Sequence, residues 1–306
     1  MHIQWYPGHM HKAGKEIREI APQVDLFIEI LDARIPFSSE NPLLAQLRGS
    51  KPCIKVLNKC DLADFDATRQ WQGYLEREQG VKTLALSIEQ PEKIKQLPEL
   101  CRKLLAFEES DNRLIHALIM GIPNVGKSTL INALAGRVIA KTGNEPAVTK
   151  SQQRIAIGNN IVLLDTPGML WPNLENKNTG YRLAVTGAIK DTAIKHDDIA
   201  YFAAEFLLKL YPNYLVDRFK LDPLPNNEHD LMLAIGKSRG CLRSGGRVDL
   251  DKTAKILLSE LRSGMLGRLT LETPAMMEQE LAELAVIREQ KAAKKLVRKQ
   301  KRKGAL

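Results

Sequence analysis

Short apolar runs and amphipathic segments alternate along the first 170 residues of the chain. Runs of about four to eight apolar residues are typical of strands buried on both faces, and apolar residues at every third or fourth position are typical of helices. The alternation predicts an α/β domain with a mostly parallel sheet and helices on both faces. We expect strands at residues 24–33, 53–61, 83–88 and 114–121, and helices at 41–47, 68–78 and 128–136.

Residues 154–168 carry two further apolar runs on either side of Gly158-Asn159-Asn160, which favours a tight turn, and so they predict a β-hairpin. After residue 195 the spacing is helical throughout, with Pro and Gly clusters between segments and no strand signal. We therefore expect an α/β domain at residues 1–180 and an all-helical domain at 181–290. The boundary is expected between Asn173 and Lys195.

The composition narrows the class of protein. Hydrophobic residues make up 44% of the 306 residues and charged residues 26%, as in soluble globular proteins. No apolar run reaches the roughly 18 residues that span a bilayer, and the N-terminus lacks the pattern of a cleaved signal. The four cysteines are scattered without a C-x-x-C pair, which argues against structural zinc and a disulfide framework. We expect a reduced, cytoplasmic protein with no membrane partner.

The net charge of +9 is concentrated at one end of the chain. Residues 291–306, the basic tail, hold eight Lys or Arg and no acid, so subtracting 8 from 9 leaves +1 for the first 290 residues. Blocks of like charge are typical of arms that bind nucleic acid or an acidic surface. The basic tail is therefore predicted to bind a polyanion, the alternative being a solvated helix that only aids solubility. Its charged residues are Lys291, Lys294, Lys295, Arg298, Lys299, Lys301, Arg302 and Lys303.

Residues 121–128, GIPNVGKS, match G-x-x-x-x-G-K-[ST] in full, between a predicted strand and a predicted helix. Such a P-loop surrounds phosphates with backbone N–H groups at a helix N-terminus, which favours anions. Lys127 is expected to bridge the β- and γ-phosphates, and the Ser128 hydroxyl to ligate Mg²⁺. The predicted phosphate-binding residues are Asn124, Val125, Gly126, Lys127, Ser128 and Thr129.

A second phosphate-side motif, Asp165-Thr166-Pro167-Gly168, ends the apolar run IVLLD. In a chain with a P-loop, an Asp at the carboxyl end of a buried strand is the expected Mg²⁺-side carboxylate. We therefore expect Asp165 to serve Mg²⁺ and the backbone N–H of Gly168 to meet the γ-phosphate.

Asn58-Lys59-Cys60-Asp61 follows the apolar run CIKVL and has the N-K-x-D pattern of guanine recognition. The Asp61 carboxylate can accept hydrogen bonds from the ring N1–H and the exocyclic amine of guanine, which adenine does not offer there. Asn58 is expected to brace the pocket, and the aliphatic stem of Lys59 is expected to cover the base.

Ser87 and Ile88, at the end of the predicted strand at 83–88, fall where a backbone N–H would meet the guanine O6. This two-residue signal is weaker than N-K-x-D. In combination with the P-loop, these base-side residues favour GTP over ATP.

The motifs come in an unusual order along the chain. In ordinary GTPases the P-loop comes first, whereas here Asn58 precedes Gly121 and the D-x-x-G motif comes last. A parallel sheet tolerates such a rearrangement when the original termini lie close together. The order therefore predicts a circularly permuted P-loop GTPase domain. Because the segment after Gly168 then runs directly into the helical domain, nucleotide state and helical-domain position should be coupled.

Two further motifs accompany the permuted order, WYPGHM at residues 5–10 and DAR-x-P at 32–36. With GIPNVGKST and DTPG, they resemble the ribosome biogenesis GTPase A (YlqF) family over nearly the whole chain. The resemblance implies a cytoplasmic GTPase that binds the large ribosomal subunit late in its assembly, with hydrolysis promoted by the particle. It also implies that the helical domain contacts ribosomal RNA, whereas the basic tail looks like an extension beyond the family core. We expect GTP and GDP as ligands and a monomer in solution.

Met169 stands just after D-x-x-G, where many GTPases place a Gln that orients the attacking water. A thioether cannot align the water, so slow intrinsic hydrolysis is expected. Similarity to other GTPases suggests Asn124 as a K⁺ ligand, and the family resemblance nominates His9 as the water-orienting group. Thr149, in a loop upstream of D-x-x-G, is the threonine expected to reach Mg²⁺ in the GTP state. The expected catalytic residues are thus His9, Lys127 and Thr149, with a surface role for His9 left open.

Two other functions remain as alternatives. One is a nucleotide-insensitive RNA-binding scaffold, which the intact Lys127, Ser128, Asp165 and Asp61 argue against. The other is a permuted GTPase of the small ribosomal subunit. Relatives of that kind carry an RNA-binding barrel before the GTPase domain and a zinc-binding region after it. The stretch before Val24 is too short for a barrel, and the cysteines do not cluster.

Overall fold

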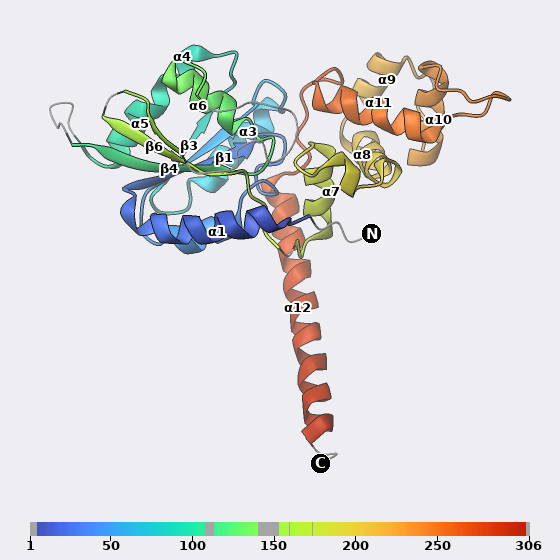
Figure 1. The fold of residues 1–306 in the computed structure, drawn as a ribbon. Coiled ribbons are helices and arrows are strands. Elements are labelled where there is room, and N and C mark those ends of the chain that lie inside the picture. Colours follow the sequence, from blue (N-terminus) through green and yellow to red (C-terminus); the bar gives the residue numbers. More distant parts are fainter. Residues whose placement is uncertain (1–4, 108–112, 140–152, 159, 173, 304–306) are drawn as a thin grey trace.

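In the computed structural model, a sheet of six strands lies between helices in the α/β half of the molecule, in the order β3-β2-β1-β4-β6-β5 (Figure 1). Neighbouring strands pair in parallel, except that β5 and β6 form the expected antiparallel hairpin. The predicted α/β class is therefore confirmed. The strands are β1 Leu26–Asp32, β2 Cys53–Asn58, β3 Val81–Ala85, β4 Ile115–Gly121, β5 Gln153–Ala156 and β6 Ile161–Asp165. The structure describes residues 5–107, 113–139, 153–158, 160–172 and 174–303.

The position predicted for the third strand, 83–88, is wrong, because β3 begins and ends earlier. Its partner β2 ends at Asn58, and the chain then turns at Lys59, whose φ is +59°. The pairing of β2 with β3 therefore ends at Leu57 and Ala85, with a hydrogen bond from the Leu86 N–H to Leu57 O (3.1 Å). Ser87 and Ile88 consequently lie after the strand instead of within it.

Helices cover both faces of the sheet, with α1 on one side and α4, α5 and α6 on the other (Figure 1). The expected helix at 68–78 begins earlier, because the Asp64 side chain accepts a hydrogen bond from the Ala67 N–H (2.9 Å) and caps α3. The helices α1, α4 and α5 were not expected. This domain contains α1 Gly8–Ile20, the 3-10 helix η1 Ala21–Gln23, α2 Pro42–Arg48, α3 Phe65–Leu75, α4 Pro91–Ile94, α5 Gln96–Leu104 and α6 Lys127–Ala135.

The second half of the chain is helical, as expected. Among the described residues beyond 195, β pairing is limited to an isolated bridge between Leu242 and Val248. None of the described helices has the length and apolar character needed to cross a membrane. The helices are α7 Lys177–Val185, the 3-10 helix η2 Asp191–Ala193, α8 His196–Leu210, α9 Pro212–Phe219, α10 Glu228–Ser238, α11 Leu250–Arg262 and α12 Pro274–Lys303.

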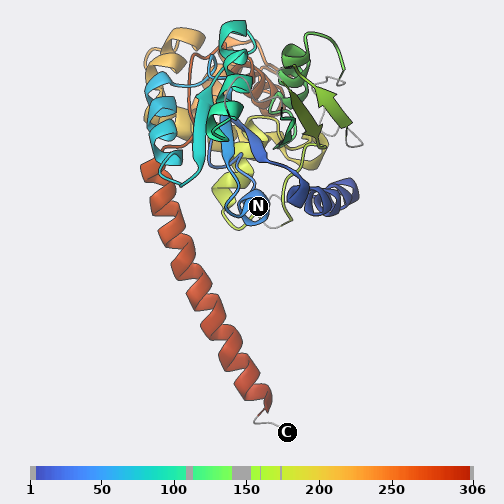
Figure 2. The ribbon, with the colours of Figure 1, turned by 90° about the vertical axis from the view of Figure 1, so that its left-hand side faces the viewer.

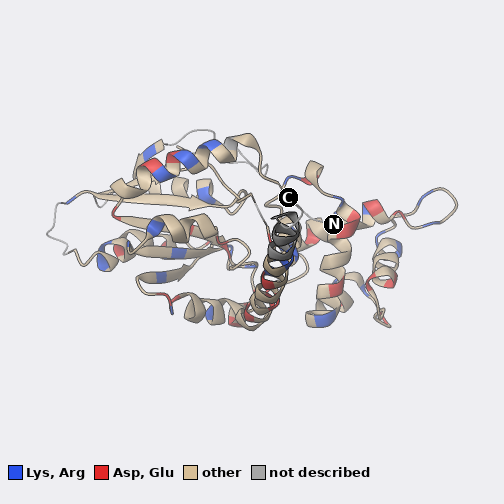
Figure 3. Cartoon of the chain, turned by 90° about the horizontal axis from the view of Figure 1, so that it is seen from below, with Lys and Arg blue, Asp and Glu red and all other residues tan. Residues whose placement is uncertain are grey.

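Helix α12 projects away from the rest of the molecule (Figures 1 and 2). Its base is held by Arg182 of α7, which donates from Nη2 to Glu280 Oε1 (2.6 Å) and lies 3.5 Å from Glu272. Its described part carries both signs of charge (Figure 3). The helix that leads into the basic tail is therefore anchored to the helix that follows D-x-x-G.

The segment between α11 and α12 returns to the α/β domain. The Leu269 N–H donates to Leu62 O (3.0 Å), and the Leu271 N–H donates to Arg34 O (2.7 Å). Trp71 Nε1 of α3 donates to Glu272 O (2.9 Å). This segment thus lies against the loops that follow β1 and β2, which carry the DAR-x-P and N-K-x-D motifs.

Glu29, in the middle of β1, is a fully buried carboxyl group that accepts a hydrogen bond from the Asn41 N–H (2.8 Å). Burial and the nearby Glu40 raise its pKa to about 8, against the opposing charge of Lys55. The folded state therefore binds a proton that the unfolded chain releases near the ordinary pKa of Glu. That proton stabilises the fold fully below the ordinary pKa, and the contribution is lost as the pH rises toward 8.

We expect the free energy of unfolding of the native protein to fall between pH 5 and 8, and the fall to be smaller in Glu29→Gln, whose amide imitates the protonated acid. Urea titrations at several pH values measure both curves. Glu92→Gln, on the exposed surface, should leave the pH dependence unchanged. Parallel curves for the native protein and Glu29→Gln would contradict this role.

Candidate functional site

A cavity of about 1120 Å³ lies at the carboxyl ends of the parallel strands. In the sheet order, the chain continues from β1 to β2 on one side and from β4 to β6 on the other, and open α/β sheets bind ligands at such a switch point. The cavity brings together motifs that are far apart in the sequence. The predicted residues that line it are Asn58, Lys59, Asp61, Ser87, Ile88, Asn124, Val125, Gly126, Lys127, Ser128, Thr129 and Gly168.

The phosphate end is built by the turn between β4 and α6. Gly126 has a φ of +93°, in the left-handed region, and a Cβ there would overlap the Asn58 side chain. Helix α6 begins at Lys127, so its first N–H groups face the same end of the cavity. Only glycine allows the loop to pass this close to N-K-x-D. The N-terminus of α6 is then free to bind an anion at this end of the cavity.

Lys127 and Asp165 form a buried ion pair at this end. Burial lowers the pKa of Lys127 and raises the pKa of Asp165, while the attraction between the two opposes both shifts. The Oδ2 atom of Asp165 is buried and accepts no hydrogen bond from the part of the chain that the structure describes. An orphaned carboxylate oxygen, together with the Ser128 hydroxyl of the pocket wall, is a donor set that fits Mg²⁺, which prefers oxygen ligands.

The D-x-x-G turn is tied to the P-loop. A Cβ on Gly168 would lie 3.1 Å from Pro123 Cα, and the Met169 N–H donates to Gly121 O (3.1 Å). The Met169 side chain points into the core, is 1% exposed, and its Sδ lies 3.6 Å from the position of a Cβ on Gly14 in α1. The side chain that replaces the usual Gln is therefore packed against α1.

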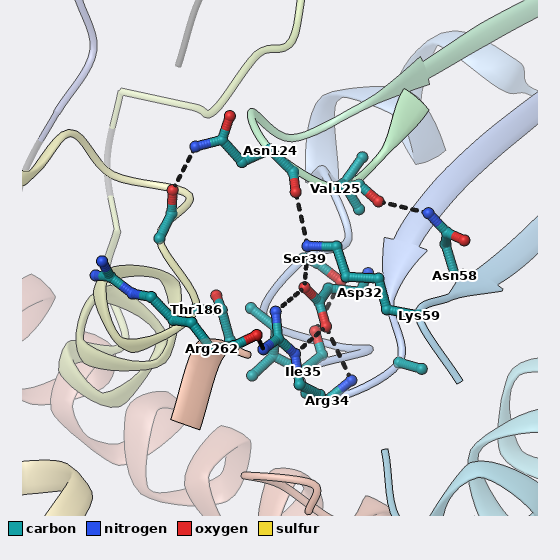
Figure 4. Close-up of polar contacts among 12 residues, drawn as sticks. Asp32, Arg34, Ile35, Ser39, Asn58, Lys59, Asn124, Val125, Thr186 and Arg262 are labelled. Carbon is teal, nitrogen blue, oxygen red and sulfur yellow. Dashed lines mark hydrogen bonds and ion pairs between the residues drawn. The ribbon is translucent and has the colours of Figure 1, made fainter. Parts of the chain in front are cut away.

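The base end is built by N-K-x-D (Figure 4). Asn58 Nδ2 donates to Val125 O (2.8 Å), which links the P-loop to the end of β2. Lys59 Nζ donates to Asn124 O (2.7 Å). The half-buried Asp61 carboxylate lines the pocket and forms no hydrogen bond with other described residues. Its oxygens can therefore accept from a base.

The other predicted base-side residues differ in exposure. Ser87 is buried and its Oγ accepts from the Glu89 N–H (3.2 Å), whereas Ile88 is 52% exposed at the rim. Cys60 does not line the cavity; its N–H donates to Leu86 O (3.3 Å), and burial raises the pKa of its thiol. Cys60, the variable position of N-K-x-D, therefore separates Lys59 from Asp61 without facing the cavity.

Asn124 connects the P-loop to the helical half of the molecule. Its backbone has a φ of +59°, and Nδ2 donates to Gly187 O (2.8 Å), just after α7 (Figure 4). Arg34 reaches the same half, because its Nη1 donates to Arg262 O at the end of α11 (3.3 Å). The pocket is thus walled on one side by the α/β domain and on the other by helices.

Several residues that line the pocket were not among the predicted site residues. Arg34 belongs to the DAR-x-P motif, but its position beside N-K-x-D depends on the pairing of β1 with β2. The wall residues from the helical half of the chain belong to no sequence motif, because tertiary packing alone brings them to the pocket. They include Thr186, Gly187, Lys190, His196, Lys255 and Arg262.

Two predicted site residues have side chains that the structure does not describe. Thr149 falls among residues 140–152, and His9 lies in α1 with a side chain that is not described. Their roles stay predictions.

The comparisons with known proteins agree on one family. A family model described as "50S ribosome-binding GTPase" matches residues 116–208. The ribosome biogenesis GTPase A of Bacillus cereus is 45% identical, over 94% of this chain and all of its own length. Mitochondrial ribosome-associated GTPase 1 of Mus musculus is 32% identical, over 88% of this chain and 90% of its own.

Two solved structures have the same fold. A GDP-bound YlqF covers 85% of this chain and 99% of its own, with a TM-score of 0.62 and 25% identity. The GNP-bound YlqF from T. maritima covers 86% and 98%, with a TM-score of 0.61 and 26% identity. The chain therefore belongs to the ribosome biogenesis GTPase A family.

Proposed function

We propose that this protein binds and hydrolyses GTP as an assembly factor in the late maturation of the large ribosomal subunit. The observation that carries the proposal is one pocket lined by N-K-x-D, the P-loop and D-x-x-G, which the sequence separates. Family membership supports the ribosomal target, because the matching family model is described by 50S binding and the relatives are named for ribosome biogenesis.

Ser128, Asp165 and Thr149 are the residues that we assign to Mg²⁺. When bound, the ion neutralises charge on the β- and γ-phosphates. We expect Lys127 to exchange the Asp165 carboxylate for phosphate oxygens when nucleotide binds, since both are anions that an ammonium binds through charge-assisted hydrogen bonds. The ion pair therefore holds both side chains in place before the nucleotide arrives.

Hydrolysis by the isolated protein is expected to be slow, because Met169 is packed in the core and cannot orient water. We assign that role to His9 and a K⁺-binding role to Asn124. The packing of α1 against Met169 supports the first assignment, since α1 carries His9 and lies beside D-x-x-G. The ribosomal particle is expected to complete the arrangement and stimulate turnover.

The helical domain is the part that we assign to ribosomal RNA and ribosomal proteins. We retain residues 1–180 as the GTPase domain, 181–290 as the ribosome-binding domain and 291–306 as the basic tail. The hydrogen bond from Asn124 to Gly187 O supports a link between nucleotide and helical domain, because one P-loop residue both lines the pocket and contacts the helical half. We expect the protein to act as a cytoplasmic monomer.

Deleting residues 291–306 should weaken binding to the large subunit and flatten its salt dependence. The negative slope of the logarithm of the association constant against the logarithm of the salt concentration should become shallower by roughly 0.7 to 0.9 for each phosphate that the shortened protein no longer neutralises, because fewer counterions are released. Titrations from low to high salt measure the slope. Deleting residues 304–306, which carry no charged side chain, is the matched control. Equal slopes for the two truncations would reduce the basic tail to a solubility feature.

Co-sedimentation with purified large or small subunits tests the proposed function. The protein with a non-hydrolysable GTP analogue should pellet with the large subunit more strongly than the protein with GDP. Equal binding in both nucleotide states would instead favour a nucleotide-insensitive scaffold. Preference for the small subunit would overturn the assignment of the particle.

A further inference from the structure

Asp32, the acid of the DAR-x-P motif, is the centre of a buried polar network beside the base end of the pocket (Figure 4). It is the last residue of β1 and pairs in register with Asn58, the last residue of β2. Arg34 Nε donates to Oδ1 (2.9 Å) and Nη2 donates to Oδ2 (2.8 Å). Asp32 and Arg34 are each 2% exposed, so this ion pair is shielded from solvent.

The turn after β1 fixes the direction of the Asp32 side chain. The Asp32 N–H donates to Ser39 Oγ (3.0 Å), and the Ile35 N–H donates to Asp32 O (2.8 Å). The Arg34 N–H also donates to Asp32 Oδ1 (3.1 Å). With its backbone and one carboxylate oxygen held in this way, Asp32 presents Oδ2 to the neighbouring motif.

Lys59, in N-K-x-D, forms a hydrogen bond with Asp32 Oδ2. Its Nζ donates to Asp32 Oδ2 (3.0 Å) and to Asn124 O in the P-loop (2.7 Å). The ammonium therefore bridges β1 and the P-loop, and the stem that leads to it lines the pocket. Burial would raise the pKa of Asp32, but Arg34 and Lys59 outweigh it and hold that pKa well below its ordinary value.

We propose that Asp32, held by Arg34, is a positioning residue for guanine-nucleotide binding, which acts by fixing Lys59 across the base end of the pocket. The proposal rests on the proposed function and deepens the part that N-K-x-D plays in it. The Lys59 ammonium is partly withdrawn from water, and an anion compensates that loss of water around the charge better than a carbonyl alone. Asp32 supplies that anion while staying behind Lys59, out of the base site.

If Asp32 only stabilised the fold, the expected kinetics would differ. Its loss would reduce the fraction of folded protein and hence the apparent kcat, but would leave the KM of the folded molecules unchanged. A positioning role changes KM for GTP and leaves kcat, because Lys127 and Asp165 at the phosphate end do not contact Asp32. The split between KM and kcat therefore separates the two.

The test is steady-state GTP hydrolysis by the full chain with Mg²⁺, for the native protein, Asp32→Asn, Lys59→Met and the double variant. Loss of a partly buried charge-assisted hydrogen bond corresponds to about a ten- to hundredfold weaker affinity, so KM should rise by that factor in Asp32→Asn with kcat within about twofold. If Asp32 acts through Lys59, adding Asp32→Asn to Lys59→Met should raise KM no further.

Glu260→Gln is the matched control, because Glu260 also pairs with two cations, Arg218 and Arg239, and does not line the pocket. It should lower stability and leave KM unchanged. A native KM in Asp32→Asn, or a full additional increase in the double variant, would overturn the proposal. If Asp32→Asn does not fold, Lys59→Met decides alone, since an unchanged KM there leaves nothing to position. Failure of the native protein to bind guanine nucleotides would contradict the proposed function instead.

Discussion

Lys127→Ala is expected to abolish measurable binding of GTP and GDP. The substitution removes the ammonium that binds the β- and γ-phosphates, and charge-assisted hydrogen bonds of this kind are the strong ones. It also leaves Asp165 buried without its counter-ion, so the carboxyl takes up a proton and loses the charge that a Mg²⁺ ligand needs. Removing one partner of a buried charged contact between a protein and its ligand costs about 2 to 5 kcal/mol of binding free energy, which corresponds to a loss of about thirtyfold or more in affinity.

Titration calorimetry with GDP and Mg²⁺ measures this loss. Lys103→Ala is the control, since Lys103 forms an exposed ion pair with Glu99 on α5. This variant should bind GDP as the native protein does. GDP affinity that is the same in Lys127→Ala and the native protein would remove the P-loop from the binding site.

Asp61→Asn should change the base preference from guanine toward xanthine. The carboxylate accepts from the N1–H and amine of guanine, whereas an amide offers a donor that suits the O2 carbonyl of xanthine. A good bidentate contact to a base contributes about 1 to 3 kcal/mol of discrimination, and the substitution removes one such contact and creates another. The ratio of xanthosine to guanosine diphosphate affinity should therefore rise by about a hundredfold or more.

Competition between the two diphosphates measures that ratio. Asp64→Asn is a control in the same loop, because Asp64 caps α3 and Asn caps helices equally well. A ratio that stays the same in Asp61→Asn would show that Asp61 does not contact the base.

The features predictable from the sequence were those with local patterns. Buried strands and the P-loop are recognised from neighbouring residues, so β4, α6 and the hairpin of β5 and β6 were placed correctly. The convergence of N-K-x-D and D-x-x-G on one pocket also follows, because the carboxyl ends of parallel strands share one edge of the sheet. The early end of β3 did not follow, since it depends on where β2 stops pairing.

The remaining features depend on contacts between distant residues. The bond between Asp32 and Lys59 requires the register of β1 against β2, which the DAR-x-P motif does not encode by itself. The return of residues 269–272 to the α/β domain depends on the packing of Trp71 and Arg34 against them. Helix α1 has buried apolar residues at Met10, Ala13 and Ile17, so its signal was present but short.

GTP turnover in K⁺ buffer, measured for the protein alone and with purified large or small ribosomal subunits, tests the central claim most directly. A particle-activated GTPase should turn over slowly alone, because Met169 is packed in the core, and faster with the large subunit. The same assay on His9→Ala should lose the stimulation if His9 orients the water. Stimulation by the small subunit, or by neither subunit, would contradict a GTPase that acts on the large subunit.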